Sequence, residues 1–179
     1  MIKKLLHNFM SMVEEGQVEI YNEFSLQHEL GIYLRENLSD YKVQFERNTK
    51  FFGITGTIKH EIDIVVYNES EKYAVELKYP VNVQYPEQMY SFLKDILFME
   101  QMKENGFNST YCLTMVNDKN FYSGKKADGI YSFFRMGSNI HGVVEKPTGN
   151  KQESICINET YKVEWTGTSE NMKYYVLEM

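Results

Sequence analysis

Residues 61–67 read EIDIVVY and residues 73–78 read YAVELK, and a short polar segment separates them. Both runs are rich in β-branched and aromatic residues, which are enriched in strands. Residues 68–71 are polar and of the length that commonly connects two antiparallel strands. The stretch therefore predicts a β-hairpin with a four-residue loop, and the rest of the fold is built around it.

The register of this hairpin brings charged side chains together. With a four-residue loop, Tyr67 pairs with Lys72, and the same register sets Asp63 opposite Glu76. Directly opposed side chains have Cβ atoms about 5 Å apart, and opposed like charges destabilise a sheet. A divalent cation between the two carboxylates would remove that repulsion. Lys78 lies on the same strand face as Glu76, where it can meet a negatively charged substrate.

A second interpretation of the same residues needs no metal. Glu61, Asp63, Glu76 and Lys78 could form a hydrated sheet face held by cross-strand salt bridges. However, helical patterns precede and follow the hairpin, and both strands are apolar, so we expect the sheet to be covered on both faces. Buried carboxylates without partners are costly. The metal site is therefore the favoured interpretation.

The flanking sequence predicts the remaining elements. A helix is expected from Gln17 or Tyr21 to Leu38, because Leu26, Leu30, Leu34 and Leu38 recur at helical spacing. A second helix begins at Pro86 and ends at Asn105-Gly106, and on it Asp95 and Glu100 are expected to face solvent or to pair along the helix. Strands are predicted at 43–47, 111–116, 154–157, 161–165 and 173–177, the last three extending or capping the sheet.

This pattern resembles the core of the PD-(D/E)XK nuclease superfamily, in which an Asp is followed after a hairpin by Glu-x-Lys, here Glu76-Leu77-Lys78. The order helix, three strands, helix, strand is also that of the superfamily. The proline that usually precedes the Asp is replaced by Ile62. The resemblance implies a restriction-endonuclease-like α/β fold with an α-β-β-β-α-β core over about residues 18–117, with a central mixed sheet flanked by helices. Residues 118–179 would then add C-terminal strands within a single domain spanning 1–179.

The resemblance also implies a site and an activity. Asp63, Glu76 and the backbone carbonyl of Leu77 would hold Mg²⁺, with Mn²⁺ as a substitute, and Lys78 would orient the attacking water and stabilise the developing charge. Glu29 resembles the accessory acidic residue of many members, and Glu23 is its rival. The implied reaction is hydrolysis of a phosphodiester in nucleic acid, DNA in preference to RNA.

Two further functional classes stay open at this stage. A nuclease-fold protein could bind nucleic acid or a protein partner without cleaving, and an α/β module could carry no site at all. The formal net charge of −6 argues against a wide basic surface that grips nucleic acid. Lys119, Lys125 and Lys126 gather in one loop-like stretch that is more typical of an ordinary surface loop. Since many relatives dimerise to cut two strands, a homodimer is compatible with the resemblance.

The remaining features concern the compartment. Cys112 and Cys156 lack the spacing of a zinc site, and two cysteines are too few for a disulfide framework. We therefore expect two buried thiols in a reducing compartment. The apolar run at Leu5-Leu6 stops at His7, and a run of this length is too short for a secretory signal. The sequence contains no run of roughly 18 apolar residues, which is the length needed to span a membrane. A cytoplasmic protein is therefore expected.

Overall fold

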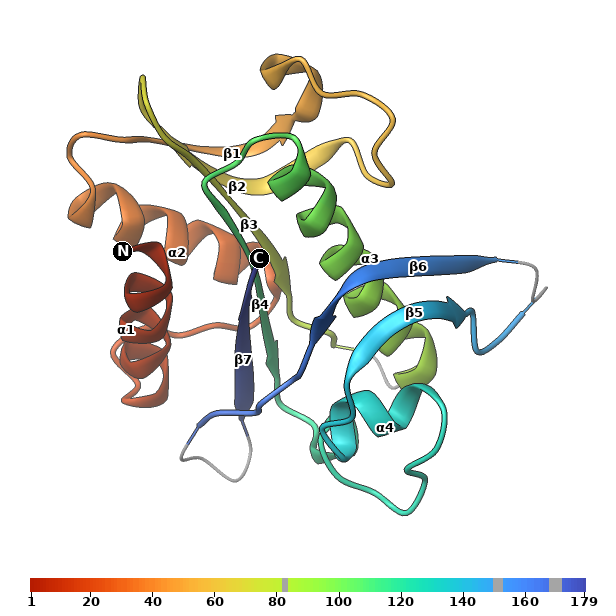
Figure 1. Ribbon diagram of the computed structural model, residues 1–179. Helices are drawn as coiled ribbons and strands as arrows, with labels where there is room; N and C mark the ends of the chain where they lie inside the picture. The colour runs from red at the N-terminus through yellow and green to blue at the C-terminus, as the bar shows by residue number, and fades with distance from the viewer. Residues whose placement is uncertain (82–83, 150–152, 168–171) are drawn as a thin grey trace.

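A computed structural model of the chain describes residues 1–81, 84–149, 153–167 and 172–179. The chain forms a mixed α/β fold with a central sheet of five strands in the order β1-β2-β3-β4-β7, flanked by helices (Figure 1). Only the pair β3–β4 is parallel among the paired strands of this sheet in the described residues. The expected α/β class and the covered central sheet are thus confirmed. The helices are α1 (Ile2–Glu14), α2 (Glu23–Asn37), α3 (Tyr85–Glu104) and α4 (Ile130–Arg135), with 3₁₀ turns η1 (Thr49–Phe52) and η2 (Lys119–Phe121). The strands are β1 (Lys42–Asn48), β2 (Glu61–Tyr67), β3 (Lys72–Lys78), β4 (Ser109–Val116), β5 (Ile140–Glu145), β6 (Ser154–Tyr161) and β7 (Lys173–Glu178).

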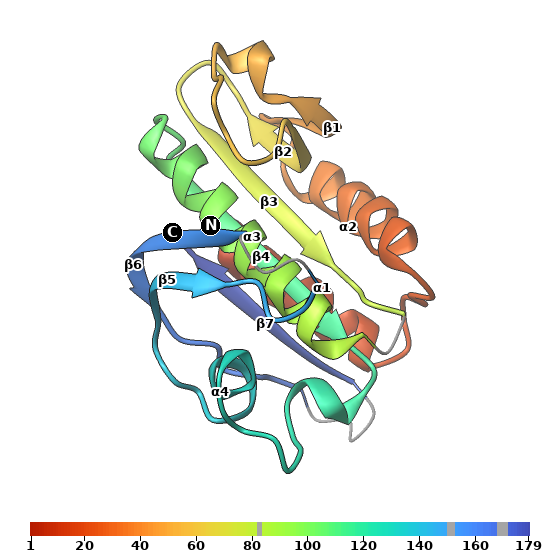
Figure 2. The same cartoon turned by 90° about the vertical axis from the view of Figure 1, so that its right-hand side faces the viewer.

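The two faces of the sheet are covered by different helices. α1 and α2 lie on one face and α3 on the other, with the β5–β6 hairpin and α4 packed outside α3 (Figure 2). Alternate residues of the strands supply two separate apolar cores, since Val75 and Leu77 face α2 while Ala74 and Cys112 face α3. The central strands are consequently buried on both sides, as the continuous burial of β4 from Thr110 to Val116 indicates.

Local sequence signals fix the ends of the two helices that border the site. Asn22 caps α2, because its side chain accepts a 2.7 Å hydrogen bond from Ser25 N, and Ser25 reciprocates to the backbone of Asn22. α3 carries Pro86 in its first turn and is followed by Gly106, whose φ of 86° a side chain would disfavour. Both helices therefore begin and end close to where the sequence predicts.

The hairpin has the predicted register. Tyr67 pairs with Lys72, so residues 68–71 form the four-residue loop, in which Asn68 Oδ1 accepts hydrogen bonds from Ser70 N and Glu71 N. Such a side chain replaces backbone partners in a tight turn. The loop thereby sets the register on which the predicted meeting of Asp63 and Glu76 depends.

The C-terminal third departs from the prediction. β7 joins the main sheet beside β4, but β6 pairs with β5 in a separate two-stranded sheet, and residues 162–165 form no strand. β5 and α4 were not predicted, because α4 has only six residues and Gly142 interrupts β5 at a register shift. Cys112 is buried as expected, but Cys156 is exposed because it lies on the outer face of β6.

Candidate active site

The sheet opens around Asp63. On one side, β1 pairs with β2 at Phe45–Ile64 and at Arg47–Ile62, and the recorded pairs skip Glu46, which would face Asp63. Glu46 has a φ of 46°, in the left-handed region that is strained for a residue with a side chain. On the other side, the recorded β2–β3 pairs end at Ile64–Val75. Within the described residues, Asp63 is therefore paired with no residue of either neighbouring strand.

Side chains replace the missing strand partners of Asp63. Its backbone N–H donates to Glu76 Oε1 at 3.2 Å, and its carbonyl accepts from Gln27 Nε2 at 2.9 Å. In return, Asp63 Oδ2 accepts a 2.7 Å hydrogen bond from Leu77 N. Gln27, on α2, also donates to Glu46 Oε1 at 2.6 Å. The carboxylates of Asp63 and Glu76 therefore each bind the main chain of the opposite strand, in the gap where the strands separate.

Two lysines bridge the carboxylates across the sheet. Lys59 Nζ forms an ion pair with Glu76 Oε2 and a second, at 3.0 Å, with Asp95 Oδ1 of α3. Lys78 Nζ lies 3.3 Å from Glu23 Oε1 and 3.7 Å from Asp95 Oδ2. Asp95 is only 4% exposed. Because Asp95 pairs with both lysines, it connects α3 to the carboxyl-terminal end of β3.

Burial sets the electrostatics of this cluster. Desolvation raises the pKa of Asp63 to about 6, although the nearby charges of Lys59 and Lys78 and the Leu77 amide oppose the shift. Burial and the charge of Asp63 raise the pKa of Glu76 well above its usual value. For Lys59, burial lowers the pKa, but the carboxylates of Asp95 and Glu76 outweigh it and raise the pKa overall. The site therefore favours the protonated forms of Asp63 and Glu76 and the charged form of Lys59.

The charges within the cluster do not balance. Asp63, Glu76, Asp95 and Glu23 supply four carboxylates, and Lys59 and Lys78 supply two ammonium groups. When all six groups are ionised, two negative charges remain. An added divalent cation would neutralise them, which is a stronger argument for a cation than any single residue provides.

The donor atoms also suit a hard cation. Carboxylate and carbonyl oxygens are the ligands that Mg²⁺ and Mn²⁺ prefer. In the described part of the structure, Asp95 Oδ2 is buried and accepts no hydrogen bond. However, no group of three His, Cys, Asp and Glu side chains among the described residues is arranged to hold a metal ion. The donor atoms suit Mg²⁺ or Mn²⁺, but the ammonium group of Lys59 lies between the carboxylates of Glu76 and Asp95.

Two cavities border the cluster. One of about 210 Å³ lies between α2 and the hairpin and is lined by Glu23, Phe24, Gln27, Glu46, Asp63 and Leu77. The other, of about 360 Å³, lies on the α3 side and is lined by Ile58, Lys59, Lys78, Ser91, Lys94, Asp95 and Glu153. The first is rich in carboxylates and the second in lysines, so the two sides of the site differ in charge.

The structure brings most of the sequence-predicted residues together. Asp63 and Glu76 meet, and Lys78 joins them through Asp95, which also pairs with Lys59. The carbonyl of Leu77 accepts a 3.2 Å hydrogen bond from Lys78 Nζ. Glu29 is not among the residues that contact them. It lies two positions beyond Gln27 on α2, and side chains two apart do not share a helix face. Its rival Glu23 contacts both Lys78 Nζ and Tyr79 N instead.

Three residues of the cluster were not predicted as such. Asp95 was expected to face solvent or pair along α3, yet it is buried, because Phe92, Phe98 and Met99 around it belong to the apolar core. A carboxylate inside an apolar helical stripe is a signal that the sequence contained. Lys59 lies in an irregular segment and Gln27 looks like an ordinary polar helix residue, so no periodicity marks either.

Comparison of the chain with models of protein families, with curated proteins and with solved structures finds no match. None of the helices in residues 1–81, 84–149, 153–167 and 172–179 combines the length and apolar character needed to cross a bilayer. The functional argument therefore depends on the site itself.

Proposed function

We propose that this protein is a divalent-metal-dependent nuclease of the PD-(D/E)XK type that hydrolyses phosphodiester bonds in DNA. The observation that carries the proposal is the buried cluster in which Asp63 and Glu76 meet at the opening of the hairpin, with Lys78 beside them. The four carboxylates of this cluster outnumber its two lysines, so once its acids ionise it offers the negative charge that a cation site requires. Perturbed pKa values next to a cavity add to the same argument.

The arrangement of elements supports the restriction-endonuclease-like form of the fold. The succession α2-β1-β2-β3-α3-β4 follows the α-β-β-β-α-β order, and α3 makes the crossover between the parallel strands β3 and β4. Because β3 ends at Lys78, its carboxyl end carries the cluster, which is where ligands bind in open α/β sheets. β7 and the β5–β6 hairpin are additions outside that core.

Asp63, Glu76 and the carbonyl of Leu77 are the groups that would hold Mg²⁺. The ion would polarise the phosphate and lower the pKa of a water molecule. Lys78 supplies positive charge for the phosphate oxygens, and Glu23 and Asp95 hold its ammonium group in place. Lys59 neutralises Glu76 and Asp95, so it preserves a buried acidic site when no divalent cation is bound.

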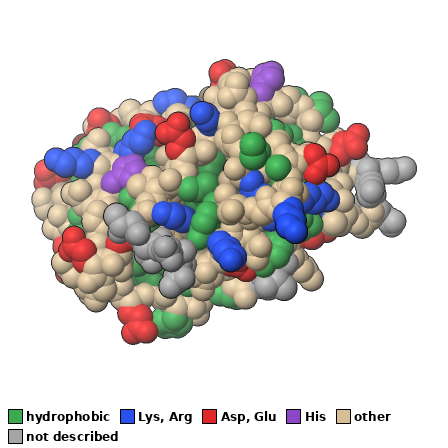
Figure 3. Space-filling view, turned by 90° about the horizontal axis from the view of Figure 1, so that it is seen from below, with side chains coloured by type: hydrophobic (Ala, Val, Ile, Leu, Met, Phe, Trp, Pro, Cys, Tyr) green, Lys and Arg blue, Asp and Glu red, His purple; other side chains and the backbone are tan. Residues whose placement is uncertain are grey.

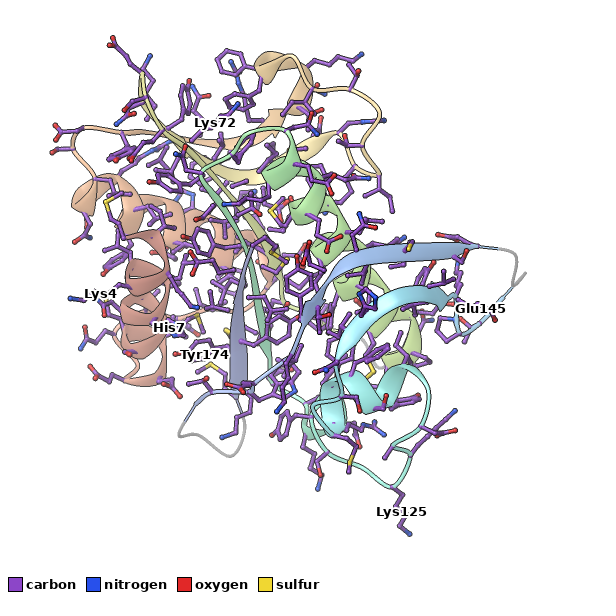
Figure 4. The ribbon with its side chains drawn as sticks, in the orientation of Figure 1. Lys4, His7, Lys72, Lys125, Glu145 and Tyr174 are labelled. Carbon is purple, nitrogen blue, oxygen red and sulfur yellow. The ribbon has the colours of Figure 1, made fainter. Side chains whose placement is uncertain are left out.

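The test is a cleavage assay on linear, nicked, single-stranded and branched DNA, with RNA as a control, in Mg²⁺ or Mn²⁺. Wild type is expected to cut at least one DNA substrate, and EDTA to stop it. Lys78→Met keeps the aliphatic part of the side chain and removes the charge, so the rate is expected to fall about a hundredfold or more. The matched control is Lys4→Met, since Lys4 is exposed on α1 and points away from the molecule (Figure 4).

Cleavage by Lys78→Met at the wild-type rate would contradict the proposal. A protein that binds Mn²⁺ at Asp63 and Glu76 but cuts none of these substrates would favour the non-cleaving alternative. Thermal melts of each variant distinguish a lost charge from a lost fold.

A further inference from the structure

The lysine-lined cavity on the α3 side contains groups that the proposed cation site does not use. Ser91 and Lys94 lie three residues apart on α3 and therefore on one helix face, and both line this cavity with Lys59 and Lys78. Lys78 and Asp95 belong to the cavity and to the acidic cluster at once. The cavity is thus continuous with the place where a substrate phosphate would meet Lys78.

The side chains that line this cavity carry one more positive than negative charge, although the net charge of the whole chain is −6. Three lysines line it against two carboxylates, Asp95 and Glu153. The carboxylate of Asp95 is shared by the ammonium groups of Lys59 and Lys78. Glu76 and Glu23 also pair with Lys59 and Lys78, respectively. Of the three lysines that line the cavity, Lys94 is therefore the one whose charge is least neutralised.

The partner of Lys94 is weakly held. Lys94 Nζ lies 4.0 Å from Glu153 Oε1, and their side chains are 36% and 47% exposed. Glu153 also pairs with Lys146 at 3.1 Å, so its carboxylate sits between two lysines from different elements. Exposed ion pairs of this kind contribute about 0–1 kcal/mol. A carboxylate and a backbone phosphodiester present similar oxygens and the same single negative charge to a lysine.

We propose that this cavity binds a backbone phosphate of the nucleic acid adjacent to the phosphate held at Lys78, with Lys94 as its ligand, and that Glu153 occupies this position in the absence of substrate. The proposal rests on the proposed nuclease function for its choice of ligand. Glu153 precedes β6, whose hairpin packs outside α3, so the substrate would displace a surface carboxylate and leave the core intact.

The distribution of charge over one face of the molecule bears on the approach of a polyanion. Several Lys and Arg side chains gather there around apolar side chains near the middle, and Asp and Glu lie mostly toward the rim (Figure 3). Lys125 projects from the lower end of the molecule (Figure 4). An acidic protein can therefore still present a positively charged approach to a polyanion.

The test measures binding of a short fluorescein-labelled DNA duplex by anisotropy in EDTA, over a series of salt concentrations. Without divalent cations the measurement is independent of cleavage. Lys94→Met should weaken binding about three- to tenfold and reduce the slope of log affinity against log salt by about 1, because one phosphate contact is lost. Glu153→Gln should tighten binding, because a competing carboxylate is removed. Lys4→Met is the charge-matched control.

Opposite changes in affinity for Lys94→Met and Glu153→Gln, with equal melting temperatures, are the expected result. Equal affinity for Lys94→Met and Lys4→Met would overturn the proposal, as would weaker or unchanged binding by Glu153→Gln, or no duplex binding by wild type. If Mg²⁺-dependent cleavage occurs while Lys94→Met binds normally, the nuclease function stands and this phosphate site is wrong. If the two variants behave as expected but no DNA is cut, the phosphate site stands without the nuclease.

Discussion

Asp63 links the stability of the metal-free protein to pH. Its pKa is about 6 in the fold, against 3.8 for the unperturbed group. The folded state thus holds the proton more tightly, so the contribution is fully present below about pH 4 and is lost as pH rises through about 6. Asp63→Asn cannot titrate. In EDTA, wild type should therefore lose stability relative to Asp63→Asn between these pH values, as measured by urea unfolding.

In the difference in stability between wild type and Asp63→Asn, the contributions of groups that titrate alike in both proteins cancel. Glu76 shifts in the same direction, so replacing Asp63 also relieves part of its shift. The sign of the difference does not change for that reason. A difference that is constant with pH, or that favours wild type as pH rises, would show that Asp63 is not held in a desolvating environment.

At the level of residues, the sequence was sufficient where periodicity applies. Asp63, Glu76 and Lys78 could be placed because side chains alternate along a strand and a four-residue loop sets the register. Lys59 could not be placed, because its position depends on an irregular segment between η1 and β2 that has no repeating pattern. Glu29 was preferred to Glu23 because the exact rotation of α2 was unknown.

At the level of elements, strand β1 carries a local strain at Glu46. Its left-handed conformation costs a residue with a side chain about 1–2 kcal/mol, and glycine avoids this cost. Glu46→Gly should consequently be more stable than Glu46→Ala by about 1 kcal/mol. Both variants lose the hydrogen bond from Gln27 equally, so the comparison isolates the backbone. Chemical denaturation of the two variants measures the difference.

The expected order is the reverse of the usual one. In an ordinary strand, alanine is the more stable of the two by about 0.5–1 kcal/mol. The matched control lies on the same strand, because Gln44→Gly and Gln44→Ala change a regularly paired position and should follow the usual order. A more stable Glu46→Ala would mean that β1 runs straight past Asp63, and the opening of the sheet there would then be in doubt.

Elements with strong periodicity were predicted and short ones were not. α2, α3 and the hairpin combine long apolar patterns with recognisable ends, such as Asn22 and Gly106. α4 and β5 are short, and the pairing of β5 with β6 depends on packing against α3 that no local pattern encodes. The cavity at Lys94 depends on that same packing, so the sequence alone could not predict it.

At the level of the whole molecule, binding of a divalent cation should stabilise the fold. A cation that binds only the folded state adds about 2.7 kcal/mol at a hundredfold excess over its Kd. For a chain of this size this corresponds to roughly 5–10 °C in melting temperature. Mn²⁺ or Mg²⁺ should therefore raise the Tm of wild type, and Asp63→Ala should abolish the increase. Differential scanning calorimetry measures both.

Lys59→Met provides a second comparison. The ammonium of Lys59 lies between Glu76 and Asp95, where it competes with a divalent cation for the same oxygens. Its removal should lower the Tm in EDTA and enlarge the increase that Mn²⁺ produces. An equal increase in wild type and Asp63→Ala would place the ion elsewhere in the molecule.

The backbone amide of Asp63 has one further property. Since it donates to the carboxylate of Glu76, and not to a neighbouring strand, its environment changes whenever that carboxylate gains a proton or a ligand. Its nuclear magnetic resonance signal is then a reporter of the site that requires neither substrate nor mutation. The amide of Leu77, which donates to Asp63 Oδ2, reports on the other carboxylate in the same spectrum. One titration of the intact protein could thus follow the two acids separately.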